Sequence, residues 1–487
     1  MYFFFGGKLV KRMLPDRLWI CFSIGLAAVL AGAGLYWASP YAATWDEVDF
    51  SLALQRYDVL AMQPHFPGYP YFVLGGMAVH AVVANPAKAL SVLNVLVLLS
   101  AVFPLVWLLR RKMALPAALL AALAVLSSSY ALLAAARPMS DGAALGVLWW
   151  YMWAVEWAHR QTTWKAQLFP AALFSVLMGV RLSYAPFGAA LLFLWYEDWN
   201  THRRLGRVAA SVLAAALFQL IWVAAVARTE GGLFPFFKLG WAFVHGHFSE
   251  WGGTAAVSPL PFSERVRRFL LDNFLWTGIG CQNAWLLATY AAIGAIAWRA
   301  GRFRLPRALV VSALLYAVWA LLAQNIEKPR HLLPLIHFTL LYVWGRLLAA
   351  PRRWGLALAA AVVLLQAAVG IGQLREQVAT PPAVYQLADE LRDKRQSFVV
   401  YTWEETRVFD YLHVPFPHKE VFHFSFFLQD KENYRHATIY MTNHVVDGFR
   451  AQGVDVSRHV RQVKTYRSSP LADPVYGTIT LYEWMEQ

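Results

Sequence analysis

The sequence predicts an α-helical polytopic membrane protein with about 11 transmembrane helices, followed by a small C-terminal extracytoplasmic α/β domain. Hydrophobic residues make up 59% of the 487-residue chain and charged residues only 15%, whereas soluble domains are about 45–50% apolar. Lysine and arginine occur in short clusters between long apolar runs, as the positive-inside rule expects. After residue 375 the composition becomes mixed and charged. We therefore assign residues 1–375 to a transmembrane domain and residues 376–487 to the α/β domain.

The positive charge and the two cysteines exclude two other classes of protein. A net charge of +14 would suit a nucleic-acid-binding protein, but basic clusters confined to the ends of apolar runs are explained by membrane orientation. We therefore expect no nucleic acid partner. Cys21 and Cys281 both lie in or next to apolar runs, so neither a disulfide framework nor a Cys-rich metal site is available.

The basic clusters also predict how the chain lies in the cell membrane. Four basic residues precede the first apolar run at 18–36, and no clear cleavage site follows, so we predict a retained first span with the amino terminus in the cytoplasm. Residues 69–84 are apolar but too short to cross comfortably, and we predict an interfacial helix there. The C-terminal domain then lies outside. Further spans are expected near 88–109, 114–132, 141–158, 166–181, 184–198, 207–227, 275–298, 306–323, 332–349 and 354–374.

Three carboxylates stand close together in the stretch that follows the first span. If residues 44–57 form a helix, Asp46 and Asp49 lie three residues apart on one face, whereas Glu47 is turned away by about 100°. Two acids can then address one ligand. Thr44 and Glu47 also fit a capping box, in which each side chain accepts a hydrogen bond from the other residue's backbone N–H. This structural alternative accounts for Glu47 and leaves Asp46 without a structural role.

Further polar residues are expected at the outer ends of the spans. The loop at 63–70 contains three prolines, and should form a stiff wall that carries His65 and Tyr69. Other polar side chains on the outer side are Arg137, Asp141, Arg181, Lys328, Arg330 and His331. Structural alternatives apply here too, because arginines at helix ends can snorkel to lipid headgroups, and Arg137 can pair with Asp141 four residues later.

The longest internal loop and the C-terminal domain complete the expected layout. The loop at 228–274 is long enough to form a lid or an interfacial helix, and its His245 and His247 lack the further ligands that a metal site needs. In the C-terminal domain, joined by a hinge at Thr380–Pro382, Thr402–Glu405 resembles a second capping box. We expect helices near 383–394, 403–413 and 443–452, and strands near 397–402, 420–425, 436–441 and 478–484.

Three short motifs connect the chain to a known superfamily. They are WDE at Trp45–Glu47, QPHFPGYP at Gln63–Pro70 and KPRHLLP at Lys328–Pro334. In this order, and at these places relative to the spans, they resemble motifs of the GT-C superfamily of integral-membrane glycosyltransferases, in particular the protein-mannosyltransferase and aminoarabinose-transferase type. This chain differs from the family pattern in having Phe66 between His65 and Pro67, and His331 where a tyrosine is common.

The resemblance implies transfer of a sugar from a polyprenyl-phosphate-linked donor to a lipid, glycan or protein acceptor at the outer face of the membrane. An inverting transfer needs a carboxylate that takes the proton of the acceptor hydroxyl. Asp46 is the expected general base, with Glu47 and Asp49 as further catalytic candidates. The leaving lipid phosphate needs cations, which Lys328 and Arg330 can supply.

The remaining expectations concern the substrates, the metal and a competing class of protein. The outer-side residues named above, from His65 to His331, are expected to bind substrate. No cofactor is certain, and a divalent cation, Mg²⁺ or Mn²⁺, is left open.

A transporter or flippase for a lipid-linked or anionic substrate is the alternative function. Transporters usually bind near the membrane midplane and show two related halves, whereas here the charges gather at the outer edge and no repeat is evident.

Overall fold

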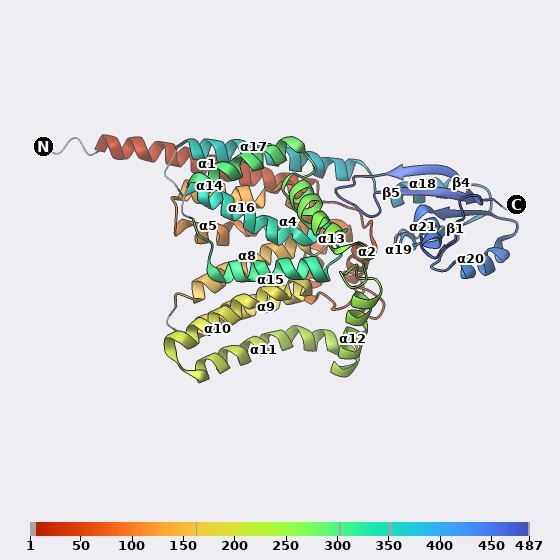
Figure 1. The fold of residues 1–487 in the computed structure, drawn as a ribbon, viewed down its shortest axis with the longest axis horizontal. Helices are drawn as coiled ribbons and strands as arrows, with labels where there is room; N and C mark the ends of the chain where they lie inside the picture. The colour runs from red at the N-terminus through yellow and green to blue at the C-terminus, as the bar shows by residue number, and fades with distance from the viewer. Residues whose placement is uncertain (1–5, 162, 301–302, 350–352, 486–487) are drawn as a thin grey trace.

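The structure, a computed structural model, describes residues 6–161, 163–300, 303–349 and 353–485 (Figure 1). Arg302 and Arg352, two of the basic residues on which the predicted orientation depends, lie outside these ranges. Apolar helices form one elongated bundle, and the sheet domain is attached to one end of it (Figure 1). The helices of the bundle are α1 (Gly6–Tyr36), α4 (Pro86–Ser100), α5 (Val102–Arg110), α6 (Leu115–Leu126), α7 (Ser129–Ala135), α8 (Asp141–Ala158), α9 (Leu168–Val180), α10 (Ala189–His202), α11 (Leu205–Thr229), α14 (Ala284–Ala300), α15 (Arg307–Ala323), α16 (Leu333–Leu348) and α17 (Arg353–Ala379).

The length and composition of the described helices support a membrane protein. Five of them are long and apolar enough to cross a membrane, or up to seven if each of two bent helix pairs counts as one span. One bent pair is α6 with α7, at 62°, and the other joins residues 262–279 to α14, at 101°. The predicted total of about 11 spans stays a prediction.

Short helices connect the spans, most of them at the end of the bundle that meets the sheet domain (Figure 1). They are α2 (Trp45–Ala53), α3 (Pro70–His80), η1 (Trp164–Gln167), η2 (Leu182–Gly188), α12 (Leu233–Ser249), α13 (Phe262–Arg267), η3 (Arg268–Ile279) and η4 (Pro329–Leu332). α2 is shorter than the helix predicted over 44–57, because the chain turns after Ala53. The short helix expected within 69–84 is present as the 11-residue α3.

The C-terminal domain is a five-stranded mixed sheet in the order β2-β1-β3-β5-β4. Its strands are β1 (Phe398–Thr402), β2 (His418–Glu420), β3 (Thr438–Thr442), β4 (Val460–Arg467) and β5 (Thr478–Trp484). β1 pairs in parallel with β2 and β3, whereas β5 is antiparallel to β3 and β4. The helices of the domain are α18 (Ala383–Arg392), α19 (Glu405–Tyr411), α20 (Phe424–Asp430), η5 (Lys431–Tyr434) and α21 (Asn443–Ala451).

Two predictions about this domain were wrong. The strand expected near 420–425 is not formed: β2 ends at Glu420, residues 421–423 have no regular structure, and α20 begins at Phe424, because Phe427 turns into the core between the sheet and Phe449. β4 was not predicted, since its residues are mostly polar and exposed and show no apolar alternation. Its hydrogen bonds to β5 fix it as the last strand of the sheet.

The two domains share apolar contacts on both sides of their junction. Ala42, Val48 and Ala87 of the membrane domain belong to the same buried cluster as β1 and α18. In the opposite direction, Leu471, from the segment between β4 and β5, packs into the core of the helical bundle. α19 lies against α2, the helix that carries the three carboxylates. The sheet domain therefore covers the end of the bundle at which α2 lies.

Candidate active site

Helix α2 presents its three carboxylates in two directions. The predicted capping box is formed: the Glu47 backbone N–H donates to Thr44 Oγ1 over 3.4 Å, and Glu47 Oε2 accepts from the Thr44 backbone N–H over 3.2 Å. Asp46 and Asp49 lie on the other face, where both approach His65. The side chain of Asp46 is 33% exposed, whereas those of Asp49 and Glu47 are 0% and 1% exposed. Asp46 is therefore the one of the three that a substrate can reach directly.

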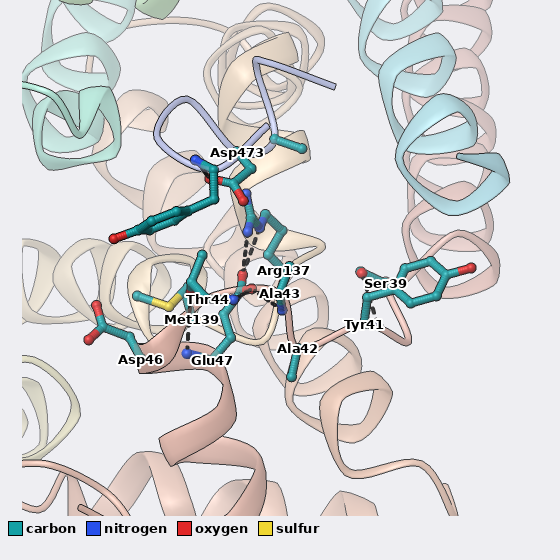
Figure 2. A network of polar contacts seen from close by, with 12 residues as sticks. Ser39, Tyr41, Ala42, Ala43, Thr44, Asp46, Glu47, Arg137, Met139 and Asp473 are labelled. Carbon is teal, nitrogen blue, oxygen red and sulfur yellow. Dashed lines mark hydrogen bonds and ion pairs between the residues drawn. The ribbon is translucent and has the colours of Figure 1, made fainter. Parts of the chain in front are cut away.

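Glu47 forms a buried ion pair with Arg137 (Figure 2). The distance from Arg137 Nη2 to Glu47 Oε1 is 2.7 Å. Burial would lower the pKa of Arg137, but the carboxylates of Glu47 and Asp473 raise it above the usual value. The alternative in which Arg137 pairs with Asp141 is wrong, because their charged groups find other partners. Glu47 and Arg137 thus join the start of α2 to the turn between α7 and α8.

The turn that carries Arg137 and Asp141 is held by a single buried amide. Asn94 of α4 donates hydrogen bonds to the carbonyls of Arg137 and Met139, over 2.8 and 2.5 Å, and accepts one from the Ala143 backbone N–H over 2.7 Å. These bonds satisfy backbone groups that would otherwise be unpaired near the start of α8. The position of the Asp141 carboxylate is therefore fixed by the protein before any ligand binds.

Arg330 links the carboxylates of Asp46 and Asp141. Its Nη2 lies 3.4 Å from Asp46 Oδ2, and its Nε lies 3.6 Å from Asp141 Oδ2. Asp141 also pairs with Arg181, over 3.1 Å. Among the described residues, Arg330 Nε and both Asp141 oxygens make no hydrogen bond although they are buried. These atoms can therefore still bind a ligand or ordered water.

Positive charge surrounds Asp46. Lys328 Nζ lies 4.0 Å from its Oδ2, and His65 Nδ1 lies 3.9 Å from its Oδ1. Burial would raise the pKa of Asp46, but Lys328, His65, Arg330 and Arg181 outweigh that effect and hold the pKa well below its usual range. Asp46 is therefore ionised in this arrangement.

Asp49 lies on the same face of α2 as Asp46, and both of its carboxylate oxygens contact other side chains. Its Oδ2 lies 3.2 Å from His65 Nδ1, and its Oδ1 accepts hydrogen bonds from Arg407 Nε and Nη2 over 3.1 and 2.9 Å. Burial raises the pKa of Asp49, although His65 and Arg407 oppose that change. The other ring nitrogen of His65 lies 3.1 Å from the Tyr69 hydroxyl. The stiff loop predicted at 63–70 is thus oriented by α2.

The last two of the predicted residues, Arg181 and His331, are in contact with each other. Arg181 donates from Nη1 to Ser140 Oγ over 3.0 Å and from Nη2 to His331 Nδ1 over 3.3 Å. The backbone carbonyl of His331 accepts from the Tyr316 hydroxyl over 2.8 Å. Arg181 is therefore engaged on several sides, and snorkelling alone does not describe it. Nine of the eleven residues predicted from the sequence are connected by polar contacts near the junction of the two domains, and the other two, Glu47 and Arg137, form a separate ion pair on the opposite face of α2.

The sequence reasoning missed the contribution of the C-terminal domain. Arg407 reaches Asp49, and Asp473 lies beside Arg137 (Figure 2). A partial signal was present in the stretch Thr402–Glu405, which was interpreted as a capping box. That interpretation was wrong, because α19 begins after Glu404 without a side-chain cap, and the Thr402 hydroxyl donates instead to the Lys419 carbonyl over 3.4 Å.

A metal site has no defined ligand set in the described residues, where no group of three His, Cys, Asp or Glu side chains could hold an ion. The Nε2 of His247 lies 2.8 Å from the Ala323 carbonyl, and His245 is in contact with the Ser249 hydroxyl. The divalent cation therefore stays a prediction that needs a direct test.

The fold is shared with proteins of known structure. A crystal structure of ArnT from Cupriavidus metallidurans bound to undecaprenyl phosphate matches 96% of this chain and 98% of its own, with a TM-score of 0.59 and 14% identity. The same protein in the apo state matches 95% and 97%, with a TM-score of 0.58 and 14% identity. The sequence matches no family model and no curated protein. At this identity the likeness shows the fold, and it confirms the predicted architecture of a helical bundle followed by a small C-terminal α/β domain.

Proposed function

We propose that this chain, which has the fold of ArnT, is a membrane glycosyltransferase that moves a sugar from a polyprenyl-phosphate-linked donor to an acceptor at the outer face of the membrane. The observation that carries the proposal is the position of Arg330, which holds Asp46 beside Lys328 and keeps a buried donor atom free. The fold supports it, since an ArnT structure with the same architecture is bound to undecaprenyl phosphate.

The cations of the cluster suit a lipid phosphate. Lys328 directly precedes η4 and Arg330 lies within it, just before the apolar helix α16, so we expect them where the phosphate of a membrane-embedded lipid would reach the surface. A phosphate oxygen that accepts from an arginine forms a charge-assisted hydrogen bond, which is about twice as strong as a neutral one. The same cations would stabilise the phosphate as it leaves the sugar.

Asp46 is proposed as the general base of an inverting transfer. Its carboxylate takes the proton of the acceptor hydroxyl while the acceptor oxygen bonds to the anomeric carbon from the face opposite the phosphate. The bond from that carbon to the phosphate oxygen breaks, and polyprenyl phosphate leaves with the electron pair. A bound donor phosphate would share the charges of Lys328 and Arg330, so the pKa of Asp46 would rise when the donor arrives. The base would then be strongest in the loaded enzyme.

The expected orientation forms part of the proposal. We infer that the protein lies in the cell membrane with its amino terminus in the cytoplasm and its C-terminal domain outside, because the basic clusters then fall on the inner side. Single cysteines introduced within 390–480 should react with a membrane-impermeant reagent added from outside, and cysteines within 202–206 should not. Outside labelling of residues 110–112 would contradict this orientation.

A transporter remains the alternative because two bent helix pairs occur, and broken helices are common in transporters. Donor turnover separates the two functions. Purified protein is incubated with a panel of labelled polyprenyl-phosphate sugars, with and without Mg²⁺, Mn²⁺ or a chelator, and release of free sugar or of polyprenyl phosphate is measured. Release by the wild type, and its loss in Asp46→Asn, is the expected result. Transport of the intact lipid without cleavage would support the transporter.

A further inference from the structure

The end of the bundle away from the sheet domain contains a cavity that the proposed reaction does not use. The cavity lies between the end of α8, the middle of α10 and the start of α15, and α10 packs against both of the other helices. Its volume is about 260 Å³, whereas a single water needs about 10–15 Å³, so a larger group fits. Part of the lining is apolar, and the charged or titratable lining residues are Glu156, His159, Arg160, Glu197 and Arg307.

This cavity and the polar cluster around Asp46 lie at opposite ends of α8. Asp141 is the first residue of α8, and Glu156 and His159 lie at its other end. A helix rises about 1.5 Å per residue, so the 18 residues of α8 span about 27 Å. The hydrocarbon core of a membrane is about 30 Å thick. The cavity therefore lies near the other surface of the membrane.

The two carboxylates of the cavity already have partners within the protein. His159 Nδ1 lies 2.6 Å from Glu197 Oε2, which joins the end of α8 to α10. Glu156 Oε2 lies 3.7 Å from Arg111 Nη1, at the end of α5. The negative charge of the lining is therefore balanced before any ligand binds.

Two arginines of the cavity remain available to a ligand. Arg160 approaches Glu156 only to 3.9 Å, and its side chain is 53% exposed. Arg307 is exposed at the first position of α15, and among the residues that the structure describes its side chain forms no ion pair and no hydrogen bond. Since the carboxylates nearby are paired, these two guanidinium groups can bind an anion at the mouth of the cavity.

An apolar stripe on α15 starts at Arg307 and runs into the membrane. Its residues are Val311, Leu314 and Val318, which follow Arg307 at intervals of four, three and four positions and so share its face of the helix. All three are exposed on the surface of the bundle. Lipid tails are as apolar as these side chains. A ligand that has its anion at Arg307 and its apolar part along this α15 stripe has the chemistry of a phospholipid.

We propose that the cavity binds the phosphate of an anionic phospholipid, which Arg160 and Arg307 hold while an acyl chain lies along the α15 stripe. Phosphate oxygens accept charge-assisted hydrogen bonds from guanidinium groups, and basic pockets between membrane helices on the cytoplasmic side suit lipid headgroups. In the proposed orientation this end of the bundle meets the cytoplasmic leaflet. The inference does not depend on the proposed function, because the cavity contains none of the residues that the reaction uses.

Native mass spectrometry of the full chain tests the inference. Delipidated protein in a non-ionic detergent is titrated with phosphatidylglycerol, with phosphatidylcholine or with inorganic phosphate. We expect the wild type to bind phosphatidylglycerol more tightly than phosphatidylcholine, whose cationic group meets the arginines. Inorganic phosphate at the same concentration should not displace the lipid, since it has no acyl chain. Arg307→Gln should weaken binding of phosphatidylglycerol about 10- to 100-fold, as expected for loss of one charge-assisted hydrogen bond.

The control variants separate this cavity from other cationic surfaces. Arg307→Gln should melt at the wild-type temperature without lipid, because the side chain has no partner within the described residues. Arg299→Gln removes another exposed arginine, in the last turn of α14, the helix that precedes α15. Arg330→Ala removes one from the polar cluster at the other end of the bundle. Both variants should bind phosphatidylglycerol as tightly as the wild type.

Four outcomes would overturn the inference. Equal binding of both lipids by the wild type would exclude selection for an anionic headgroup. Displacement of phosphatidylglycerol by inorganic phosphate would assign the cavity to a soluble anion. Wild-type affinity in the double variant Arg160→Gln/Arg307→Gln would place the lipid outside the cavity. An equal loss in Arg299→Gln, or a loss in Arg330→Ala alone, would place the lipid on another cationic surface.

Discussion

Asp49 on α2 and Arg407 on α19 form an ion pair across the junction of the two domains, with Arg407 Nη2 2.9 Å from a carboxylate that is 0% exposed. The guanidinium also lies over the ring of Trp45, 5.5 Å from its centroid. Because Asp49 orients His65 as well, the same carboxylate connects the C-terminal domain to the wall of the site.

Arg407→Met should destabilise the protein by about 3–5 kcal/mol, since removing one partner leaves a buried charge without compensation. Thermal unfolding of the full chain in detergent measures the effect. Arg435→Met is the control, because Arg435 is 71% exposed and pairs with an exposed Glu432; such pairs contribute about 0–1 kcal/mol. Adding Asp49→Asn to Arg407→Met should recover part of the loss. Equal stability of Arg407→Met and Arg435→Met would show that the ion pair does not hold the domains together.

Asp46→Asn should lower donor turnover by about 10²- to 10⁴-fold while the protein stays folded, because the amide cannot accept a proton. It should also bind undecaprenyl phosphate at least as tightly as the wild type, since the variant frees Lys328 and Arg330 from a competing anion. Turnover and lipid binding are measured on the same preparation.

The two neighbouring acids provide the controls for Asp46. Glu47→Gln keeps a side chain that can complete the capping box, and should reduce turnover less than Asp46→Asn does. If Asp46→Asn kept near wild-type turnover while Glu47→Gln or Asp49→Asn lost activity, a residue other than Asp46 would be the base. Full activity of all three variants would place the reaction elsewhere in the protein.

Arg330→Ala should weaken binding of undecaprenyl phosphate by about 10- to 100-fold, because a charge-assisted contact with phosphate contributes about 1.5–3 kcal/mol. Arg330→Lys keeps the charge but loses the planar fork, and should bind with intermediate affinity. Arg268→Ala is the control, since Arg268 forms its ion pair with a partly exposed Glu264. If Arg330→Ala bound the lipid as tightly as the wild type, Arg330 would only anchor the protein to lipid headgroups.

Glu47→Gln should lower the stability of the protein by about 3 kcal/mol, because it leaves the buried Arg137 without its main partner. The double variant Glu47→Gln/Arg137→Met removes both charges and should be more stable than Glu47→Gln alone. Glu264→Gln, in an exposed ion pair with Arg267, serves as the control. A thermal denaturation series of the wild type, these three variants and Arg137→Met alone checks the order. Additive losses in the double variant would mean that the two residues do not depend on each other.

The Glu405–His444 pair predicts a pH dependence of stability. Burial would lower the pKa of His444, but the hydrogen bond to Glu405 raises it above 6.5. Burial would raise the pKa of Glu405, but His444 holds it below 4.5. The stabilisation linked to His444 is therefore complete below pH 6.5 and is lost as the pH rises through its raised pKa, and the part linked to Glu405 is lost as the pH falls below 4.5.

The difference in melting temperature between the wild type and His444→Gln measures this pair alone. We expect the difference to be largest between about pH 5 and 6.5 and to shrink toward pH 9. His413→Gln is the matched control, because it removes a histidine of the same domain that follows α19. A difference that is constant from pH 5 to 9 would contradict the prediction.

The sequence was sufficient for local relationships within α2. The three-residue spacing of Asp46 and Asp49 predicted their shared face, and the capping pattern predicted the bonds of Glu47. Contacts between distant parts of the chain could not be predicted, since Arg407 and Asp49 are separated by 358 positions and neither residue carries a local sign of the other.

The errors in the C-terminal domain have a similar physical origin. The aromatic residues of 422–427 favour a strand, but packing of Phe427 under the sheet gives a helix there. The alternating pattern is absent from Val460–Arg467, which nevertheless forms β4 because β5 supplies its partners. In both places the tertiary contacts decide the secondary structure, and local propensity does not.

The sharing of buried residues between the two domains has a consequence for the order in which the chain folds. Val48 on α2 is synthesised early, but most of the cluster that buries it comes from residue 383 onward, which follows the last helix of the bundle. During biosynthesis α2 must therefore wait, with Asp49 uncovered, until the C-terminal domain has been made and folded. Until then the ion pair between Asp49 and Arg407 is missing, so the packing of α2 is completed last, although α2 is among the first helices to be made.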